Sequence, residues 1–214
     1  MNRTGLVIAL AVAAVVGLVF AIWPDLDLKL AALFFDPARA GFWRAYDPLY
    51  LRARDVAVWL VALVAAPAGI ALAPGVVANL VFKEHWGRPR PIDVTEFGGD
   101  EHFRPWWDPR GDCPKNCSFV AGEPSGAFWT MAGAAVVPPQ WRVLAYGTAV
   151  AFGAAVGVLR MAAGAHFFTD WVFAGVFSFL VIWFVHGWLY RWPRTRISDA
   201  AVERAIERIE AKRA

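Results

Sequence analysis

The chain has 214 residues, of which 58% are hydrophobic and 18% are charged, against about 25% charged residues in ordinary soluble domains. This composition excludes a typical soluble domain, and the slight net charge of +3, spread along the sequence, excludes a nucleic-acid-binding surface. Long apolar runs separated by polar loops instead indicate helices that cross a lipid bilayer, because about 20 apolar residues span its hydrocarbon core.

The first apolar run covers residues 5–23 and follows Asn2 and Arg3, an arrangement shared with cleavable signal peptides. The run is longer than the roughly 7–15 apolar residues of such a peptide. It also ends in Trp23-Pro24 instead of the small residues of a cleavage site. We therefore expect a transmembrane helix that is retained.

The next two segments are less regular than the first. Residues 25–54 mix Asp, Arg and Pro with short apolar pieces, which predicts an interfacial loop containing a short amphipathic helix at 28–35. Residues 56–82 are apolar but are interrupted by Pro67 and Pro74. This second run is long for one membrane crossing and short for two.

A polar loop of more than 30 residues at 83–118 then breaks the apolar pattern, and a loop of this length usually has a function. It contains the two cysteines of the chain, Cys113 and Cys117. On an oxidising face of the membrane we expect a local disulfide between them. A two-ligand metal site fits less well because structural zinc takes four ligands, and two free thiols are the plainest alternative.

Three more apolar runs complete a predicted all-α transmembrane bundle of five or six spans: 119–137, 143–159 and 167–190. After Arg191, apolar residues recur at helical spacing among Arg and Glu residues, which predicts an amphipathic helix at 197–214 lying on the membrane or on the protein itself. The chain is thus divided into a transmembrane domain at 1–196 and this C-terminal helix.

Basic residues beside the spans mark one end of the bundle as cytoplasmic: Arg142, Arg191, Arg194 and Arg196. The loop 83–118 and the turn 160–166 then lie on the opposite, periplasmic face of a bacterial inner membrane. A single span within 56–82 puts the N-terminus outside and the loop 25–54 in the cytoplasm. Two short limbs hinged near 67–74 give six spans and return the N-terminus inside.

Three short segments, all predicted on the same face, hold the candidate catalytic groups. The first, 83–91, delivers Lys83 and Arg90 into a loop stiffened by prolines. Such a cluster can hold a phosphate, although a basic helix end near lipid head groups is the commoner arrangement. The second, 118–126, has Gly122 at a predicted helix start, where backbone N–H groups can bind an anion, although small residues also pack transmembrane helices.

The third segment, 160–170, is the most informative of the three. His166 and Asp170 stand four residues apart at the predicted start of a helix and therefore share one face. The carboxylate can fix the tautomer of the imidazole and leave its other nitrogen free to attack. An isolated His at a helix start is usually structural, but a His with this Asp and with Arg160 six residues before it indicates catalysis.

Together these segments resemble the type 2 phosphatidic acid phosphatase (PAP2) superfamily, which shares its core with vanadium haloperoxidases. The first motif of that family is Lys-x6-Arg-Pro, and the third is Ser-Arg-x5-His-x3-Asp. The positions that match are Lys83, Arg90, Pro91, Arg160, His166 and Asp170. Leu159 replaces the Ser of the third motif, and the resemblance covers residues 75–185.

The second motif of the family, Pro-Ser-Gly-His, can be aligned with this chain in two ways. Pro124-Ser125-Gly126 reproduces its first three residues but is followed by Ala127 instead of the His. Family members often carry Ser-Phe before the motif, and Ser118-Phe119 fits that longer pattern. We prefer this second register, in which Glu123 stands at the position of the His and Ala121 at that of the Ser.

The resemblance implies a mechanism that needs no metal and no cofactor. His166 takes the phosphoryl group and Asp170 orients it. Glu123 protonates the leaving oxygen in place of the family's His, which requires its protonated form, and a neighbouring phosphate dianion favours that form. The implied phosphate-binding groups are Lys83, Arg90, Arg160 and the backbone at Gly122.

The implied function is hydrolysis of a phosphate monoester or pyrophosphate on a membrane lipid. Compatible substrates are phospholipids such as phosphatidic acid, polyprenyl pyrophosphate and lipid A. One alternative is a phosphotransferase that uses the same phosphohistidine. Another is a lipid-phosphate-binding protein without catalysis, but a mere binder does not need His166 oriented by Asp170. The sequence leaves the oligomeric state open.

Overall fold

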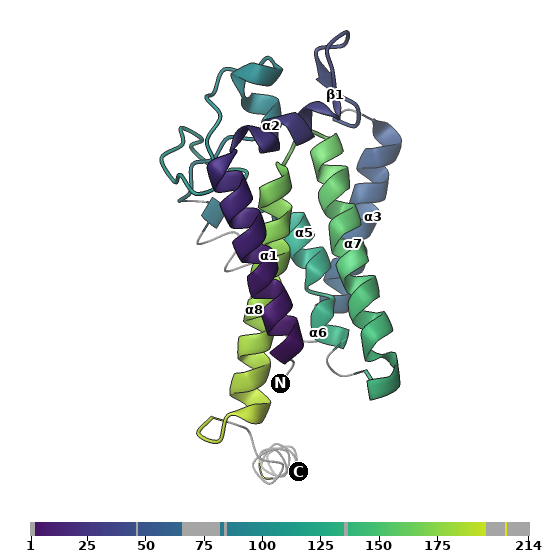
Figure 1. The fold of residues 1–214 in the computed structure, drawn as a ribbon. Helices are drawn as coiled ribbons and strands as arrows, with labels where there is room; N and C mark the ends of the chain where they lie inside the picture. Colours follow the sequence, from purple (N-terminus) through teal and green to yellow (C-terminus); the bar gives the residue numbers. More distant parts are fainter. Residues whose placement is uncertain are drawn as a thin grey trace.

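The computed structural model describes residues 3–45, 47–65, 82–83, 85–134, 137–195 and 204. Within these ranges the chain is mostly helical, and the helices stand side by side as a bundle (Figure 1). Two predicted features fall elsewhere. The hinge near 67–74 and, apart from residue 204, the helix at 197–214 lie outside the described residues.

Three described helices are long and apolar enough to cross a membrane: Arg3–Ile22, Pro139–Ala162 and Phe168–Arg191. The first is α1 (Arg3–Ile22). The second joins η5 (Pro139–Trp141) to α7 (Arg142–Ala162), and the third joins α8 (Phe168–His186) to the π-helical turn η6 (Gly187–Arg191). The helices predicted from the first, fourth and fifth apolar runs are therefore confirmed, with ends within a few residues of those expected.

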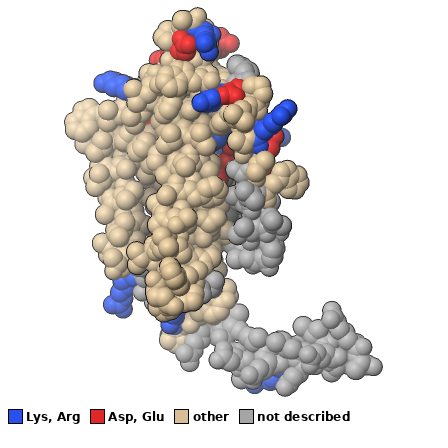
Figure 2. All heavy atoms as spheres, turned by 90° about the vertical axis from the view of Figure 1, so that its right-hand side faces the viewer, with Lys and Arg blue, Asp and Glu red and all other residues tan. Residues whose placement is uncertain are grey.

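The flanks of the bundle carry little charge. On the face shown in Figure 2, Lys, Arg, Asp and Glu gather toward the two ends, and other residues cover most of the surface between them. Large apolar side chains stand exposed along α1 and α7, among them Val7 at 65%, Leu18 at 64% and Val143 at 85%. Such a surface suits contact with lipid tails, whereas a soluble monomer rarely exposes apolar patches of this extent.

The described part of the apolar run 119–137 is not a single transmembrane helix. It forms two short helices, α5 (Gly122–Phe128) and α6 (Met131–Ala134). α5 packs against both α7 and α8, so its apolar side chains fill the bundle core instead of facing lipid. Composition cannot distinguish these two settings, because a buried core helix and a membrane-spanning helix are equally apolar.

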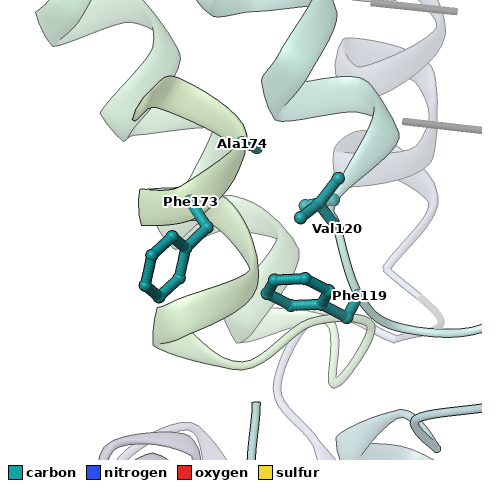
Figure 3. Close-up of a cluster of buried hydrophobic side chains, with 5 residues drawn as sticks. Phe119, Val120, Phe173 and Ala174 are labelled. Atoms are coloured by element: carbon teal, nitrogen blue, oxygen red, sulfur yellow. The ribbon is translucent and has the colours of Figure 1, made fainter. Parts of the chain in front are cut away.

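A close-packed core fixes α5 and the segment before it against the neighbouring helices. One buried cluster joins the segment before α5 to α8: Phe119, Val120, Ala121, Phe173 and Ala174 (Figure 3). Gly153 lets α7 approach α5 closely, because a Cβ at this position would lie 2.3 Å from the Phe128 ring. Burial of a Phe side chain contributes about 1.5–3 kcal/mol, so these contacts hold the start of α5 firmly in place.

The chain between α1 and α3 (Pro48–Ala65) forms a cap at one end of the bundle. It contains α2 (Asp25–Ala32), close to the short helix expected at 28–35, and two short strands, β1 (Phe35–Asp36) and β2 (Gly41–Phe42). The strands pair antiparallel, with Phe35 opposite Phe42. Their aromatic side chains pack on Phe97 of the long loop, so the cap and the loop share one end.

This arrangement overturns the topology expected for a five-span bundle, in which residues 25–54 lie opposite the loop 83–118. Asp27 instead forms an ion pair with Arg88 at 2.8 Å, and the Phe20 ring stacks on Phe168 with centroids 5.3 Å apart. Some basic residues of the cap pair locally with Asp, as Arg39 does with Asp36 at 3.4 Å, so their charges do not indicate the side of the membrane.

Candidate active site

The turn between α7 and α8 delivers the candidate nucleophile. Gly164 has a φ of +67°, a left-handed conformation that favours glycine, and a Cβ at this position would lie 2.4 Å from the Phe42 ring. The Gly164 carbonyl accepts a hydrogen bond from the Ile92 backbone at 3.0 Å. The turn is thus fixed on both sides, and it presents His166 just ahead of the first residue of α8.

His166 is held by the backbone of the second segment. Its Nδ1 lies 2.9 Å from the Ser118 carbonyl oxygen, and because a carbonyl can only accept, we assign the ring proton to Nδ1. The Nε2 atom then carries the lone pair. Burial lowers the pKa of His166 to about 4, against the opposing effect of Asp170. The imidazole is therefore neutral near pH 7, as a nucleophile must be.

Asp170 lies in the first turn of α8 whereas His166 precedes the helix, so the two do not share a helix face as expected, and Asp170 does not bind the ring closely. The nearest Asp170 oxygen is 3.8 Å from His166 Nδ1. That same oxygen accepts hydrogen bonds from Ser118 Oγ at 2.5 Å and from the Phe167 backbone at 2.7 Å. The carboxylate consequently orients the imidazole through Ser118 and the helix start, and the Ser118 carbonyl fixes the tautomer.

Arg88 lies behind these residues, fully buried. Its Nη1 donates to Asp170 Oδ1 at 2.5 Å and its Nη2 to Asp27 Oδ2 at 2.8 Å. Burial alone would lower the pKa of Arg88, but the two carboxylates outweigh burial and hold that pKa above its ordinary value. The guanidinium also lies 4.5 Å from the centre of the Phe167 ring, which is favourable for a cation.

The three predicted phosphate-binding side chains lie close enough together to affect one another electrostatically. Lys83 Nζ donates to Asn116 Oδ1 at 3.2 Å, and Arg90 Nη2 donates to the Asn116 carbonyl at 2.8 Å. Arg160, at the end of α7, contacts the Tyr50 hydroxyl at 3.4 Å. Burial and then Arg90 lower the pKa of Lys83 to about 8, and burial and then Arg160 lower the pKa of Arg90. Cations that repel one another in this way favour a bound anion.

The predicted disulfide is present and supports this cation cluster. Cys113 and Cys117 are joined, with Cα atoms 5.8 Å apart. The closed loop contains Asn116, which has a φ of +54° and provides the acceptors for Lys83 and Arg90. The cross-link therefore restrains the residue that orients two of the three cations.

Glu123 faces the cation cluster from the first turn of α5. Its Oε2 lies 2.9 Å from Arg160 Nε, and its Oε1 accepts from Arg54 Nε at 3.0 Å. This position agrees with the register that aligns Glu123 with the second-motif His. In the competing register Ser125 is buried, and its hydroxyl donates to the Ala121 carbonyl, so it serves the helix and not the site.

Gly122 opens α5 beside Glu123, at the helix start predicted from the second segment. The preceding residue, Ala121, donates its backbone N–H to the Asp170 carbonyl at 3.2 Å. This hydrogen bond ties the start of α5 to the first turn of α8. The three segments identified from the sequence therefore meet at one end of the bundle.

Sequence reasoning assigned no role in the site to several residues that complete it: Asp27, Arg54, Arg88, Ser118 and Thr169. Two signals could have revealed some of them. Arg88 stands two residues before the motif arginine, in Gly-Arg-Pro-Arg-Pro. Asp27 stands among apolar residues near a membrane helix, where an ionisable group usually has a functional partner.

The arrangement suits transfer of a phosphoryl group to histidine. It combines a neutral imidazole with a free nitrogen, three cations that can neutralise phosphate oxygens, and one carboxylate at the same end of the bundle. Among the residues that the structure describes, no three His, Cys, Asp or Glu side chains gather closely enough to hold a metal ion.

The sequence profile of the PAP2 superfamily matches residues 57–194, which is more than half of the chain. The chain therefore belongs to the PAP2 superfamily of membrane lipid phosphatases. It is 33% identical over 218 residues to the lipid A 4'-phosphatase of Francisella tularensis subsp. novicida, an alignment that covers 89% of this chain and 98% of that relative.

Two further relatives align over a shorter region. The lipid A 4'-phosphatase of Rhizobium leguminosarum is 39% identical over 111 residues, covering 52% of this chain and 47% of the relative. That of Rhizobium etli is 37% identical over 131 residues, covering 61% and 48%. No solved structure matches the chain.

Proposed function

We propose that this protein removes a phosphate monoester from lipid A, or from a closely related lipid, through a phosphohistidine at His166. The observation that carries the proposal is the environment of this residue. Nδ1 binds the Ser118 carbonyl at 2.9 Å, which leaves Nε2 free, and Lys83, Arg90 and Arg160 supply positive charge nearby. The printed names of the relatives support lipid A as the substrate.

In the first step Nε2 of His166 attacks phosphorus, the N–P bond forms, and the bond from phosphorus to the lipid oxygen breaks. The cations stabilise charge on the three equatorial oxygens, which supplies most of the catalysis in phosphoryl transfer. The imidazole becomes cationic, and the Ser118 carbonyl and the Asp170 carboxylate stabilise it. In the second step water attacks phosphorus, the N–P bond breaks, and neutral His166 is restored with release of inorganic phosphate.

Glu123 is proposed to give a proton to the leaving lipid oxygen and to recover one from the attacking water. Without substrate, its carboxylate pairs with Arg160 and Arg54. An incoming phosphate dianion competes for Arg160 and leaves Glu123 beside a second anion. That change favours a protonated carboxyl, the form that can act as an acid.

We further propose that the site faces the periplasm of a bacterial inner membrane and that the bundle has six spans. A disulfide between Cys113 and Cys117 requires an oxidising face. At the other end, Arg142 and Arg191 adjoin the spans, as cytoplasmic residues do. α1 and α8 are antiparallel, so the start of α1 and the end of α8 lie at the same end of the bundle, and the number of spans that joins them is even.

The test is phosphate release by the purified protein from bisphosphorylated lipid A, phosphatidic acid and a polyprenyl pyrophosphate, each with and without EDTA. We expect lipid A to be the best substrate, mass spectrometry to locate the lost phosphate, and EDTA to have no effect. His166→Ala should abolish release, whereas His102→Ala, an exposed histidine at the same end of the molecule, should not. More than a tenth of wild-type activity in His166→Ala refutes the proposed nucleophile.

The same assay separates the two alternative functions. A phosphotransferase would place the label of a radioactive lipid phosphate on a second lipid instead of releasing it as inorganic phosphate. A binding protein would retain the lipid and release nothing, and His166→Ala would leave that binding intact.

A further inference from the structure

The start of α8 is held by two carboxylates from different parts of the chain. The first N–H groups of a helix lack partners within the helix and need acceptors from elsewhere. Asp170 accepts from the Phe167 backbone at 2.7 Å, from within the same turn. Asp27, on α2, accepts from the Thr169 backbone at 3.1 Å. The helix that follows His166 is therefore fixed partly by the N-terminal cap.

The two carboxylates are joined to each other by shared donors. Arg88 donates to both of them, and its Nη1 also lies 2.8 Å from Thr169 Oγ1. The Thr169 hydroxyl donates to Asp27 Oδ2 at 2.6 Å. The side chains of Arg88, Thr169 and Asp170 are fully buried, and Asp27 is 1% exposed. In such a dry environment each hydrogen bond constrains its neighbours strongly.

This network reaches the nucleophile in three steps. Asp170, fixed on one oxygen by Arg88, accepts from Ser118 Oγ at 2.5 Å on the other. Ser118 in turn holds the ring of His166 through its carbonyl. Asp27 does not contact His166, and its effect on the ring passes through Arg88 and Thr169.

Docking of the N-terminal helices does not require these buried charges. Phe20 stacks on Phe168, and Trp106 packs on Gly17, where a Cβ would lie 3.3 Å from its ring. Buried ionic groups often contribute little net stability compared with apolar residues of the same size, and their best attested role is to select one geometry. Apolar contacts thus suffice for attachment, and the polar network has another role.

We propose that Asp27 and Thr169 are positioning residues for the phosphatase reaction, which set the orientation of His166 and Asp170 through Arg88. On this account, which rests on the proposed function, the helix pair α1–α2 is a working part of the active site and not only a membrane anchor. A misplacement of a reacting group by about 1 Å can cost about 100-fold in rate, so a small relaxation of the network suffices to slow catalysis.

The sharpest test compares two substitutions of Thr169 in the purified full-length protein. Thr169→Val keeps the shape and removes the hydroxyl, whereas Thr169→Ser keeps the hydroxyl and removes a methyl group. If Thr169 positions the site, kcat for p-nitrophenyl phosphate should fall at least fivefold further in the Val variant than in the Ser variant, with KM little changed in both. If it only fills space, the Ser variant will be the poorer of the two, and the proposal fails.

A second comparison uses α2. Asp27→Asn keeps the size and leaves Arg88 paired with Asp170, and we expect kcat to fall about 10- to 100-fold, on the scale of a lost alignment. Asp25→Asn, an exposed position on the same helix, is the matched control and should stay within twofold of wild type. Equal kcat values for the two variants, or a change in KM alone for Asp27→Asn, would overturn the proposal.

Activity on p-nitrophenyl phosphate tests the positioning proposal independently of the lipid A proposal. Hydrolysis of this aryl phosphate depends on His166 whichever lipid is the natural substrate. Wild-type activity on p-nitrophenyl phosphate with no activity on lipid A contradicts the assigned substrate and leaves the positioning test intact. An acid-labile, base-stable phosphoenzyme should form on mixing with labelled substrate, and it should form more slowly in Asp27→Asn. Formation at the wild-type rate would count against the positioning role.

Discussion

Two arginines that stand two residues apart have opposite surroundings. Arg88 is completely buried, and two carboxylates, a hydroxyl and a carbonyl take up its donors. Among the described residues, Arg90 donates to the Asn116 carbonyl alone, and it lies beside Lys83 and Arg160. Pro89 and Pro91 stiffen the segment between and after them, so neighbouring side chains point to different partners.

One short motif thus supplies both parts of a site. Arg88 belongs to the buried network that supports the site, here called the frame, and Arg90 belongs to the groups that meet the substrate, here called the working surface. The Arg88 charge is already neutralised, so this arginine has little attraction left for a substrate. The Arg90 charge is opposed by other cations, so it gains most when a phosphate arrives. Each substitution described next changes either the buried Arg88 network or the phosphate-binding groups and leaves the other set unchanged.

The largest effect should come from removing the two arginines in turn. Arg88→Ala leaves two buried carboxylates without their shared cation, at a cost of about 3–5 kcal/mol, and we expect poor expression and a much lower unfolding temperature. Arg90→Ala should fold normally but lose about 100-fold in kcat with a smaller change in KM, because it acts on the transition state. Thermal unfolding and phosphate release measured on both variants check this. A normal unfolding temperature for Arg88→Ala contradicts the contrast.

Next in size is the effect of Glu123, which pairs with Arg54 and Arg160. If it protonates the leaving oxygen, Glu123→Gln should lose about 100-fold on a lipid phosphate and little on p-nitrophenyl phosphate, whose phenol leaves without a proton. Glu123→His should recover part of the lipid activity. Equal losses on both substrates would mean that Glu123 acts by orienting Arg160 and is not an acid.

A smaller effect concerns pH and the lysine of the cluster. With p-nitrophenyl phosphate, whose leaving group needs no proton from Glu123, the activity requires neutral His166 and charged Lys83, whose pKa values are lowered to about 4 and about 8. The kcat/KM profile should therefore fall below the first value as the imidazole gains a proton, and above the second as the ammonium loses one. Lys83→Arg should remove the alkaline fall, because arginine stays protonated to about pH 12. Lys115→Arg, an exposed position in the same loop, should leave the profile unchanged.

The smallest effect should come from the disulfide. Closure of so short a loop stabilises the protein by about 2 kcal/mol, and the loop holds Asn116, the acceptor for Lys83 and Arg90. A reductant, or the Cys113→Ser and Cys117→Ser pair of substitutions, should lower kcat/KM a few-fold without abolishing it. The intact protein should gain no mass from a thiol-alkylating reagent until it is reduced. Labelling without reductant would argue against an oxidised loop.

The sequence predicted the working surface better than the frame. His166, Asp170, Lys83, Arg90 and Arg160 stand in spaced motifs, and spacing on a helix or loop is visible in one dimension. The frame depends on pairs such as Asp27 with Arg88, which are 61 residues apart and have no local pattern. Contacts of this kind follow only from the tertiary packing of α1 and α2 against α8.

The fold was predicted in the same uneven way. The long helices α1, α7 and α8 follow from continuous apolar runs, because length and composition decide them. The run at 119–137 was predicted without the break that separates α5 from α6, and the α5 residues are apolar because they are buried between α7 and α8. The contacts of Asp27 with Arg88 and of Phe20 with Phe168 place the cap at the same end of the bundle as the loop 83–118. No count of basic residues could reveal such contacts.

The spacing of the buried network along the chain has a consequence for biosynthesis. When Arg88 is synthesised its first partner, Asp27, has already been made, but its second partner, Asp170, follows 82 residues later. A nascent chain therefore carries a half-neutralised arginine until the last helix has been inserted. A chain that ends before α8 leaves Arg88 with one of its two carboxylate partners, so the cap and the loop 83–118 should be held less firmly in a truncated molecule than in the complete bundle.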